Sequence, residues 1–346
     1  MLNISILSFA VTLHISLVST ETIPDQEAGP WVVYEGQKGP GFGHHIVFVT
    51  GDDEYRSEEG MPMLAKILAF RHGFKCTVLF AINTDDQTIQ PDYPYNIPGL
   101  EQLAFADLMI LFIRFRELPD DQMKHIMAYV QSGKPLIGLR TATHSFFYRN
   151  NLSSPYAKYS HDSSCPEGGF GQLVLGDTWI SHHGDHGSES TRGVINQSHK
   201  NHPVLQGVRD IWGPSDVYTI QHLPDDATVL VWGQVIQGMQ ATDSPVKGIK
   251  NNPMMPLAWT KHYLTDSGVS ARVMVCTMGA SIDLQNEGLR RLLVNSCYWG
   301  LTLEKQISPE SNVDYVGRYQ PTNFGFDGYT PGIKPDQLQW PSPTTD

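Results

Sequence analysis

The sequence predicts an α/β protein with an open, doubly wound, mostly parallel sheet, and three observations lead to this prediction. Short apolar runs alternate with helical patterns between about residues 44 and 150, as in consecutive βαβ units. The runs are apolar along their whole length, as parallel strands covered on both faces must be. The chain has 346 residues, 40% of them hydrophobic, which suits one large core with elaborations better than two equal domains.

The first half of the chain supplies four strands. They are predicted over residues 44–50 ("HHIVFVT"), 75–82 ("KCTVLFAI"), 106–115 ("ADLMILFIRF") and 134–140 ("KPLIGLR"). All four are rich in aliphatic residues, and polar loops follow them. Because parallel strands are joined by crossovers, we expect the connections to be right-handed.

Two helices lie between these strands. The first begins near Ser57, a residue type that favours helix N-termini, and has apolar residues at helical spacing. The second covers residues 118–133, opens with Pro119 and ends at Gly133. Its apolar stripe consists of Met123, Ile126, Met127 and Val130. The stripe predicts that this helix packs one face against the sheet.

The second half of the chain is less regular. Residues 178–196 and 202–220 read as short strands with functional loops, and 227–235, 254–263 and 271–279 as three further strands. A helix at 284–301 then ends the core. The tail from about residue 307 is rich in Pro, Gly, Asn and Tyr, which predicts surface coil.

The two ends of the chain differ from its centre. Residues 1–20 are apolar and end in Ser and Thr, which predicts a secretory signal, although no Lys or Arg precedes the apolar run. A buried first strand or a membrane anchor are the alternatives. We therefore divide the chain into a signal peptide (1–20), an extension (21–42), a main domain (43–305) and a tail (306–346). Export would place the mature protein in the periplasm or outside the cell, with no stable membrane span.

The charge of the chain limits its partners. The formal net charge is -12, so the chain repels the phosphate backbone and nucleic acid is excluded as an expected partner. The oligomeric state is left open.

Ligands of doubly wound sheets bind at the carboxyl ends of the strands. This sequence places charged and polar residues at three such ends. They are Asp52, Glu54, Tyr55 and Arg56 after the first strand, Arg114 and Arg116 after the third, and Arg140, Thr143 and His144 after the fourth. We assign Asp52 and His144 to catalysis and the others to substrate binding.

Arg140 directly continues an apolar strand, where a tight turn into a helix is expected. An arginine at such a position should be half-buried and paired, and the predicted partner is a carboxylate from residues 52–58. A structural pair and an oxyanion-binding role remain equal alternatives for this guanidinium.

The segment "SHHGDHG" holds His182, His183, Asp185 and His186 within five residues. Imidazole and carboxylate are common zinc ligands, so these four residues form a predicted metal set, although their spacing matches no standard zinc motif. Without a metal, His183 or His186 would transfer protons. We expect this loop to fold over the carboxyl edge of the sheet and face His144. The alternative is that these side chains only hydrogen-bond the loop.

Several motifs together resemble the ThuA-like family, named after trehalose utilisation. They are "VFVTGDDEYRSEE", "LIGLRTATHSF", "SHHGDHGSESTRG", "NHPVLQG" and "NEGLRRLLVNSCYWGL", and the resemblance spans Gly43 to Leu303. It implies a flavodoxin-like sheet of the class I glutamine amidotransferase type, with helices on both faces and an elaborated second half. The chain is most similar to exported, planctomycete-type members.

The resemblance also bears on the tight turn after the fourth predicted strand, the elbow that carries Arg140. Amidotransferases have G-x-C-x-G there, with a nucleophilic cysteine, whereas this chain has "GLRTA" with Arg140 in the cysteine position. ThuA-like proteins commonly have histidine at this place, so the chain departs from the family that it resembles as well. Since arginine is never a nucleophile or base at neutral pH, the chain is not expected to be a glutamine amidotransferase.

Two functions follow from the resemblance. The first is an exported enzyme that processes a sugar or keto-sugar by hydrolysis or isomerisation, with an unknown cofactor or a divalent metal such as zinc. The second is a non-catalytic carbohydrate-binding or scaffold protein. In the second case the binding surface would consist of aromatic residues such as Tyr55, Phe146, Trp212, Trp232 and Trp259.

Overall fold

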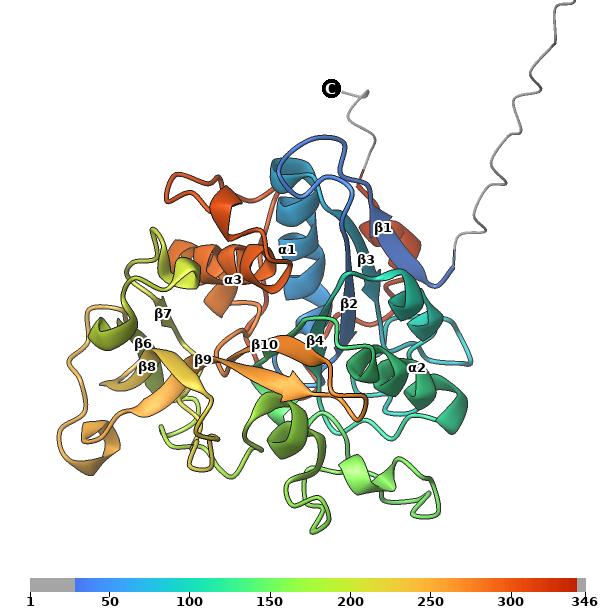
Figure 1. The fold of residues 1–346 in the computed structure, drawn as a ribbon, viewed down its shortest axis with the longest axis horizontal. Coiled ribbons are helices and arrows are strands. Elements are labelled where there is room, and N and C mark those ends of the chain that lie inside the picture. Colours follow the sequence, from blue (N-terminus) through green and yellow to red (C-terminus); the bar gives the residue numbers. More distant parts are fainter. Residues whose placement is uncertain (1–28, 341–346) are drawn as a thin grey trace, which may run out of the picture.

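The computed structural model describes residues 29–340, and a single ten-stranded sheet forms its centre (Figure 1). The strand order is β1-β3-β2-β4-β5-β10-β9-β8-β6-β7. The strands are β1 (Trp31–Tyr34), β2 (His45–Gly51), β3 (Lys75–Leu79), β4 (Leu108–Ile113), β5 (Leu136–Leu139), β6 (Glu189–Ile195), β7 (Trp212–Gly213), β8 (Thr228–Gln237), β9 (Met255–Leu264) and β10 (Ser270–Cys276). The protein is therefore a mixed α/β protein with one large sheet.

The prediction that the sheet is mostly parallel was wrong. Only the block β3-β2-β4-β5-β10 is parallel, and the five other pairings are antiparallel. The reason is the length of the connections. Only residues 265–269 separate β9 from β10, whereas a parallel crossover needs about a dozen residues or more, so these strands must form a hairpin. The flavodoxin-like description therefore fits only the parallel block.

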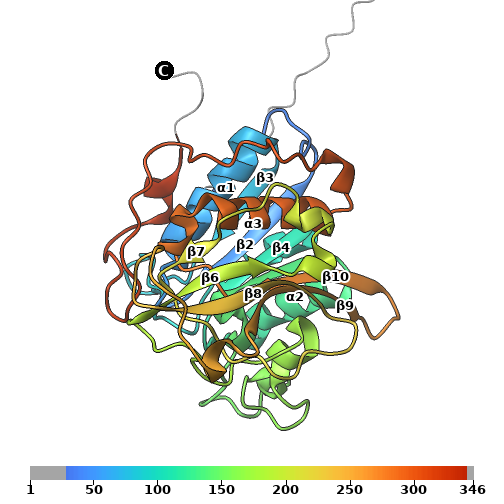
Figure 2. The ribbon, with the colours of Figure 1, turned by 90° about the vertical axis from the view of Figure 1, so that its left-hand side faces the viewer.

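Two hydrophobic cores lie on opposite faces of the sheet. Ile46 and Phe48 of β2 belong to the core that contains helices α1 (Ser57–His72) and α3 (Glu287–Gly300). Val47 and Val49 belong to the core that contains α2 (Asp120–Gln131). Successive side chains of a strand point to opposite faces, which explains why β2 contributes to both cores. Helices α1 and α3 lie next to each other on the same side of the sheet (Figure 2). Because β3, β2, β4 and β5 are parallel, their carboxyl ends lie at the same edge of the sheet.

Two terminal segments add to the core. Residues 31–34, inside the predicted extension, form β1 and pair with the outer side of β3. The tail returns to the same region, where the Tyr34 hydroxyl donates to the Leu338 carbonyl (2.7 Å). The tail is thus held to the sheet as coil with short 3₁₀ turns. The predicted signal segment 1–20 lies outside the described residues, and no helix within 29–340 has both the length and the apolarity needed to cross a membrane.

His72 at the end of α1 should make the stability of the protein depend on pH. Its Nε2 donates to the Asn312 carbonyl (2.9 Å), and its Nδ1 accepts from the Tyr298 hydroxyl (2.9 Å). Burial lowers the pKa of His72 to about 4, so the unfolded chain binds this proton more tightly. The contribution of neutral His72 to the free energy of unfolding is therefore complete above about pH 6.5. It decreases as the pH falls towards 4, by up to about 3 kcal/mol.

Urea unfolding at several pH values between 7 and 4 measures this effect. The variant His72→Gln should lose less stability than the wild type over this range, whereas a variant of the exposed His199, His199→Gln, should behave as the wild type. Equal losses in all three proteins would contradict the role of His72.

Candidate active site

Two irregular segments lie side by side and bring the site together. The amide of His183 donates to the Val217 carbonyl (2.8 Å), and the amide of Thr219 donates to the Ser181 carbonyl (3.0 Å). His182 and Tyr218 form an isolated antiparallel bridge between them. The "SHHGDHG" segment therefore lies against residues 216–219, so that its imidazoles reach the side chain of Asp216.

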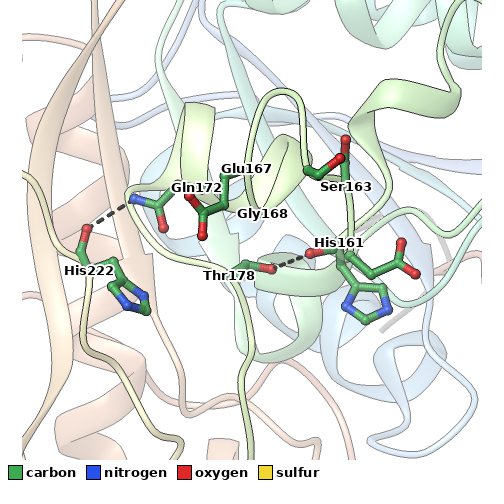
Figure 3. Close-up of a pocket in the computed structure, with 9 residues that line it drawn as sticks. His161, Ser163, Glu167, Gly168, Gln172, Thr178 and His222 are labelled. Atoms are coloured by element: carbon green, nitrogen blue, oxygen red, sulfur yellow. Dashed lines mark hydrogen bonds between the residues drawn. The ribbon is translucent and has the colours of Figure 1, made fainter.

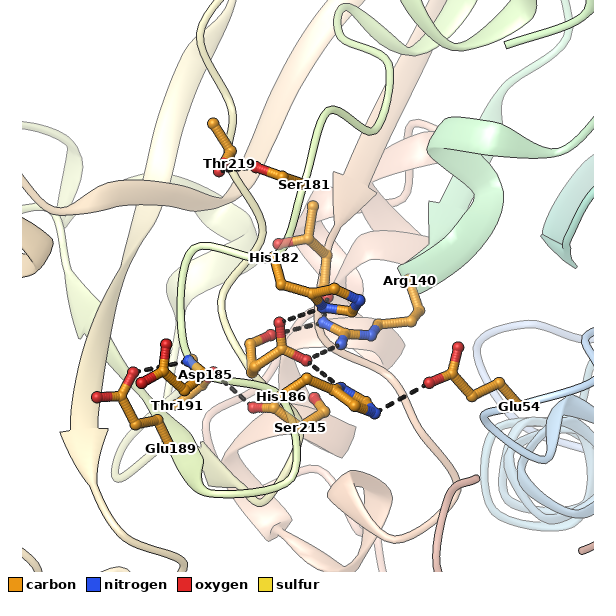
Figure 4. Close-up of polar contacts among 12 residues, drawn as sticks. Glu54, Arg140, Ser181, His182, Asp185, His186, Glu189, Thr191, Ser215 and Thr219 are labelled. Atoms are coloured by element: carbon orange, nitrogen blue, oxygen red, sulfur yellow. Dashed lines mark hydrogen bonds and ion pairs between the residues drawn. The ribbon is translucent and has the colours of Figure 1, made fainter. Parts of the chain in front are cut away.

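Asp216 is the centre of the site: the side chains of Arg140, His182 and His186, which lie close together in Figure 4, all bond it. Its Oδ2 accepts from His182 Nδ1 (2.7 Å), and its Oδ1 accepts from both His186 Nδ1 (2.9 Å) and the Arg140 guanidinium (2.8 Å). Burial alone would raise the pKa of this carboxyl, but the Arg140 charge and the two imidazole hydrogen bonds hold the pKa well below its ordinary range. Asp216 is therefore ionised, and each group around it must donate.

Arg140 lies at the predicted elbow after β5, and its backbone is left-handed (φ 44°). Such a conformation costs a non-glycine residue about 1–3 kcal/mol and is typical of functional turns. The side chain is fully buried. Besides the Asp216 carboxylate, the guanidinium bonds three other groups. It donates to the backbone carbonyls of Asp216 (2.6 Å) and Thr277 (2.8 Å) and to the Tyr55 hydroxyl (3.0 Å). The prediction that a carboxylate from residues 52–58 pairs with Arg140 was wrong. That loop supplies only the Tyr55 hydroxyl, and the acid is Asp216, which follows β7.

His186 joins two carboxylates. Its Nδ1 bonds Asp216 and its Nε2 lies 3.1 Å from Glu54 Oε1, as Figure 4 shows. The hydrogen bonds with Asp216 and then Glu54 raise the pKa of His186 to about 9. Burial favours the neutral form of Glu54, but the His186 contact and the Arg114 charge lower its pKa overall. His186 thus links the loop after β2 to Asp216.

His182 has a free ring nitrogen. Since ionised Asp216 can only accept, Nδ1 of His182 must carry hydrogen, and Nε2 of the neutral ring is then an unprotonated acceptor. Within residues 29–340, Nε2 of His182 has no hydrogen-bond partner, and the side chain is 36% exposed. A carboxylate-oriented imidazole with a free, accessible nitrogen is suited to proton transfer.

A second buried acid fixes the backbone that carries Asp216. Asp283 accepts from the Ser215 hydroxyl (2.5 Å) and amide (3.1 Å) and from the amides of Gly279 and Ala280 (3.0 Å each). These bonds tie residue 215 to the turn after β10. The position of Asp216 therefore depends on the end of the parallel block.

The four residues of the predicted metal set do not all lie together in the structure. His183 Nε2 donates to the Lys250 carbonyl (2.8 Å), and Asp185 accepts from Lys250 Nζ (2.7 Å), so neither side chain joins the central group. Instead, His182, His186 and Asp216 each offer a ligand atom within 4.8 Å of the others. This donor set could hold a divalent metal such as zinc.

The other predicted residues at the end of β2 have structural contacts. Asp52 is fully buried and accepts from the Thr141 hydroxyl and from the amides of Glu54 and Tyr55, and desolvation raises its pKa to about 6. Asp52 thus links two strand-end loops and does not reach His182. Arg56 donates to the carbonyls of Glu54 (3.2 Å) and Gly325 (2.6 Å), so it fastens the tail.

The residues after β4 and β5 lie around the site. Arg114 pairs with Asp53 (2.9 Å), whereas buried Arg116 donates to the carbonyls of residues 91, 93 and 114. Thr143 lies within hydrogen-bond distance of His144 Nδ1 (3.2 Å). Burial lowers the pKa of His144 well below its usual value, and its ring packs against Trp179 (5.2 Å between centroids). His144 is therefore neutral and belongs to the wall of the site.

The sequence missed Asp216 and Asp283 as site residues, and it placed His182 in the metal set while naming His183 and His186 for proton transfer. Asp216 stands in "GPSDVYTI", where nothing distinguishes it from an ordinary loop acid. The one available signal was Arg140 itself, because a buried guanidinium requires a carboxylate partner. The prediction sought that partner in residues 52–58 and not among the acids of the second half.

Comparisons with known proteins identify one family. The model of the ThuA family, described as trehalose utilisation, matches residues 46–300. A ThuA-like protein from Parabacteroides merdae is 15% identical, with a TM-score of 0.46 over 75% of this chain and 90% of that one. A second, from Bacteroides uniformis, is 16% identical, with a TM-score of 0.45 over 79% and 96%. No curated protein matches the chain. Because the family model covers well over half of its length, the chain belongs to the ThuA family.

Proposed function

We propose that the protein is an exported enzyme that processes a sugar or keto-sugar by acid–base chemistry, with His182 as the proton-transfer group. The observation that carries this proposal is the contact between His182 Nδ1 and ionised, buried Asp216, which leaves Nε2 free. The sugar substrate is suggested by the family, whose description is trehalose utilisation. The histidine loop and Arg140 both bond Asp216, and Glu54 joins them through His186, which favours an enzyme over a non-catalytic protein.

The proposed division of labour follows from the contacts. Hydrolysis and isomerisation of a sugar both need a group that takes a proton and returns it. His182 takes the proton on Nε2, and Asp216 stabilises the imidazolium that forms. Arg140 is fully buried, so it acts through Asp216 as a positioning residue and does not bind the oxyanion of a substrate. His186 and Glu54 complete the charge balance around Asp216.

A divalent metal at His182, His186 and Asp216 is the alternative use of the same atoms. The buried Arg140 guanidinium, 2.8 Å from Asp216, already neutralises this carboxylate, and its positive charge would repel a dication bound to the same group. We therefore favour direct proton transfer. A metal, if bound, would act as a Lewis acid on a substrate oxygen.

Product analysis by NMR with purified protein tests the proposal, using trehalose, other disaccharides and keto-sugars as substrates. We expect the protein to turn over at least one of these sugars, and the rate to be unchanged after the protein has been treated with a chelator and dialysed. Loss of turnover that zinc restores would replace direct proton transfer by the metal alternative. Binding without turnover would favour the carbohydrate-binding protein. Export is tested by the intact mass of protein from the native host, which should lack about the first 20 residues.

A further inference from the structure

A cavity with uncharged walls adjoins His186. Its volume is about 650 Å³, within the range of small-molecule sites. Five parts of the chain line it: the histidine loop, the β7 region, the turn after β8, the segment before α3 and the tail. The lining residues that matter here are Gly187, Trp212, Met239, Gln285, Asn323 and Phe324. None of the nine residues that line it carries a formal charge.

The lack of charge distinguishes this cavity from its neighbours. A cavity of about 690 Å³ has Thr178 in its wall, together with the ionisable residues Asp162, Glu167, His161 and His222 (Figure 3). A third, of about 380 Å³ near the start of α3, is lined by Arg209, Glu287 and other charged residues. In a chain of net charge -12, an uncharged cavity supplies an ionic ligand with no partner of opposite charge, so it favours neutral ligands.

The walls of the uncharged cavity have the two properties that a sugar ring needs. Trp212 and Phe324 offer apolar aromatic surface, which suits the C–H face of a pyranose. Gln285 and Asn323 offer exposed side-chain amides with no hydrogen-bond partner within residues 29–340. An amide both donates and accepts, so it matches hydroxyl groups, which do the same.

The tail connects this cavity to the proposed active site. The Phe324 ring lies 5.3 Å from the His186 ring and 5.5 Å from the Tyr55 ring. The amide of Gly325 donates to the Glu54 carbonyl (2.8 Å), which fixes the tail beside the acid that bonds His186. Residues 323 and 324 lie outside the part of the chain that the family model matches.

We infer that this cavity is a subsite for a neutral sugar ring, and that Asn323 and Phe324 of the tail make it specific. The inference rests on the proposed function for the class of ligand. It adds that the sugar is uncharged, and that a phosphorylated or acidic sugar is excluded. It also assigns a binding role to a tail that sequence reasoning treats as surface coil.

Equilibrium titrations of trehalose, D-glucose and D-glucose 6-phosphate test the subsite. We expect the wild type to bind trehalose or glucose, and to bind the phosphate at least tenfold more weakly than glucose. Gln285→Ala and Asn323→Ala should each weaken binding of the neutral sugar about threefold to tenfold, the equivalent of one hydrogen bond. Phe324→Ala should weaken it about tenfold or more.

Phe105→Ala is the matched control, because Phe105 is 72% exposed and lies outside the cavity. It should bind as the wild type. Since Phe324 also packs on His186, the two amide variants carry the test if Phe324→Ala folds poorly. The inference is overturned if both amide variants bind as the wild type, if glucose 6-phosphate binds as well as glucose, or if neither neutral sugar binds below about 10 mM.

The same titrations with His182→Asn separate this inference from the proposed function. Retained sugar binding without turnover in this variant supports both. Unchanged binding in all cavity variants, together with loss of turnover in His182→Asn, would refute the subsite and leave the proposed function in place. Weaker binding in the cavity variants, with turnover unaffected by His182→Asn, would support the subsite and refute the catalytic role of His182.

Discussion

Replacing His182 by asparagine should lower turnover by about 10²- to 10⁴-fold, the range typical for loss of a general acid or base. The asparagine side-chain amide can still donate to Asp216 from a position close to that of Nδ1, so the contact at 2.7 Å is largely kept. What is lost is the free Nε2. The fold should therefore be unchanged while kcat falls, and the KM for the sugar should change little.

The neighbouring His183 supplies the control for this experiment. Its Nε2 donates to the Lys250 carbonyl (2.8 Å), away from Asp216. His183→Gln preserves a donor at that end of the side chain and should retain the turnover of the wild type. Equal losses of turnover in the two variants would show that the loop, and not the His182–Asp216 pair, is what the reaction needs.

Replacing Arg140 by methionine should destabilise the protein by about 3–5 kcal/mol, because it leaves a buried carboxylate without its permanent positive charge. Both side chains of the pair are fully buried. The two imidazoles remain on Asp216 and compensate in part. Urea unfolding at pH 7 measures the loss. The double variant Arg140→Met with Asp216→Leu should be more stable than the sum of the single effects predicts.

A surface ion pair provides the comparison for Arg140. Lys75 and Glu35 lie 2.9 Å apart but are 38% and 62% exposed. Lys75→Met should therefore cost no more than about 1 kcal/mol. If Arg140→Met costs no more than Lys75→Met, the elbow guanidinium does not hold Asp216 in place, and the proposed positioning role is wrong.

Local patterns predicted the regular part of this protein. The apolar runs of β2 to β5 and the stripe of α2 depend on residues close in sequence, and the structure has these elements at nearly the predicted positions. The hairpin of β9 and β10 was also readable, since the seven residues between the two predicted strands cannot hold a crossover. The prediction of a mostly parallel sheet did not take this short connection into account.

The site was harder to predict because it depends on long-range contacts. Arg140 meets Asp216 across 76 residues of sequence, and the histidine loop is joined to the segment after Asp216 by a single isolated bridge, between His182 and Tyr218. Left-handed backbone at Arg140 is also not encoded by a glycine. Sequence reasoning therefore identified an elbow arginine and a histidine-rich loop, but not the acid between them.

The tautomer of His182 tests the central claim most directly, because it needs neither a substrate nor a functional assay. Nitrogen-15 NMR of histidine-labelled protein, with His182→Asn used to assign the signals, reports which ring nitrogen carries hydrogen. At a pH where His182 is neutral, we predict hydrogen on Nδ1, held by Asp216, and an unprotonated Nε2. Hydrogen on Nε2 instead, as a metal bound at Nδ1 would require, would contradict the proposed role of His182 as the proton-transfer group.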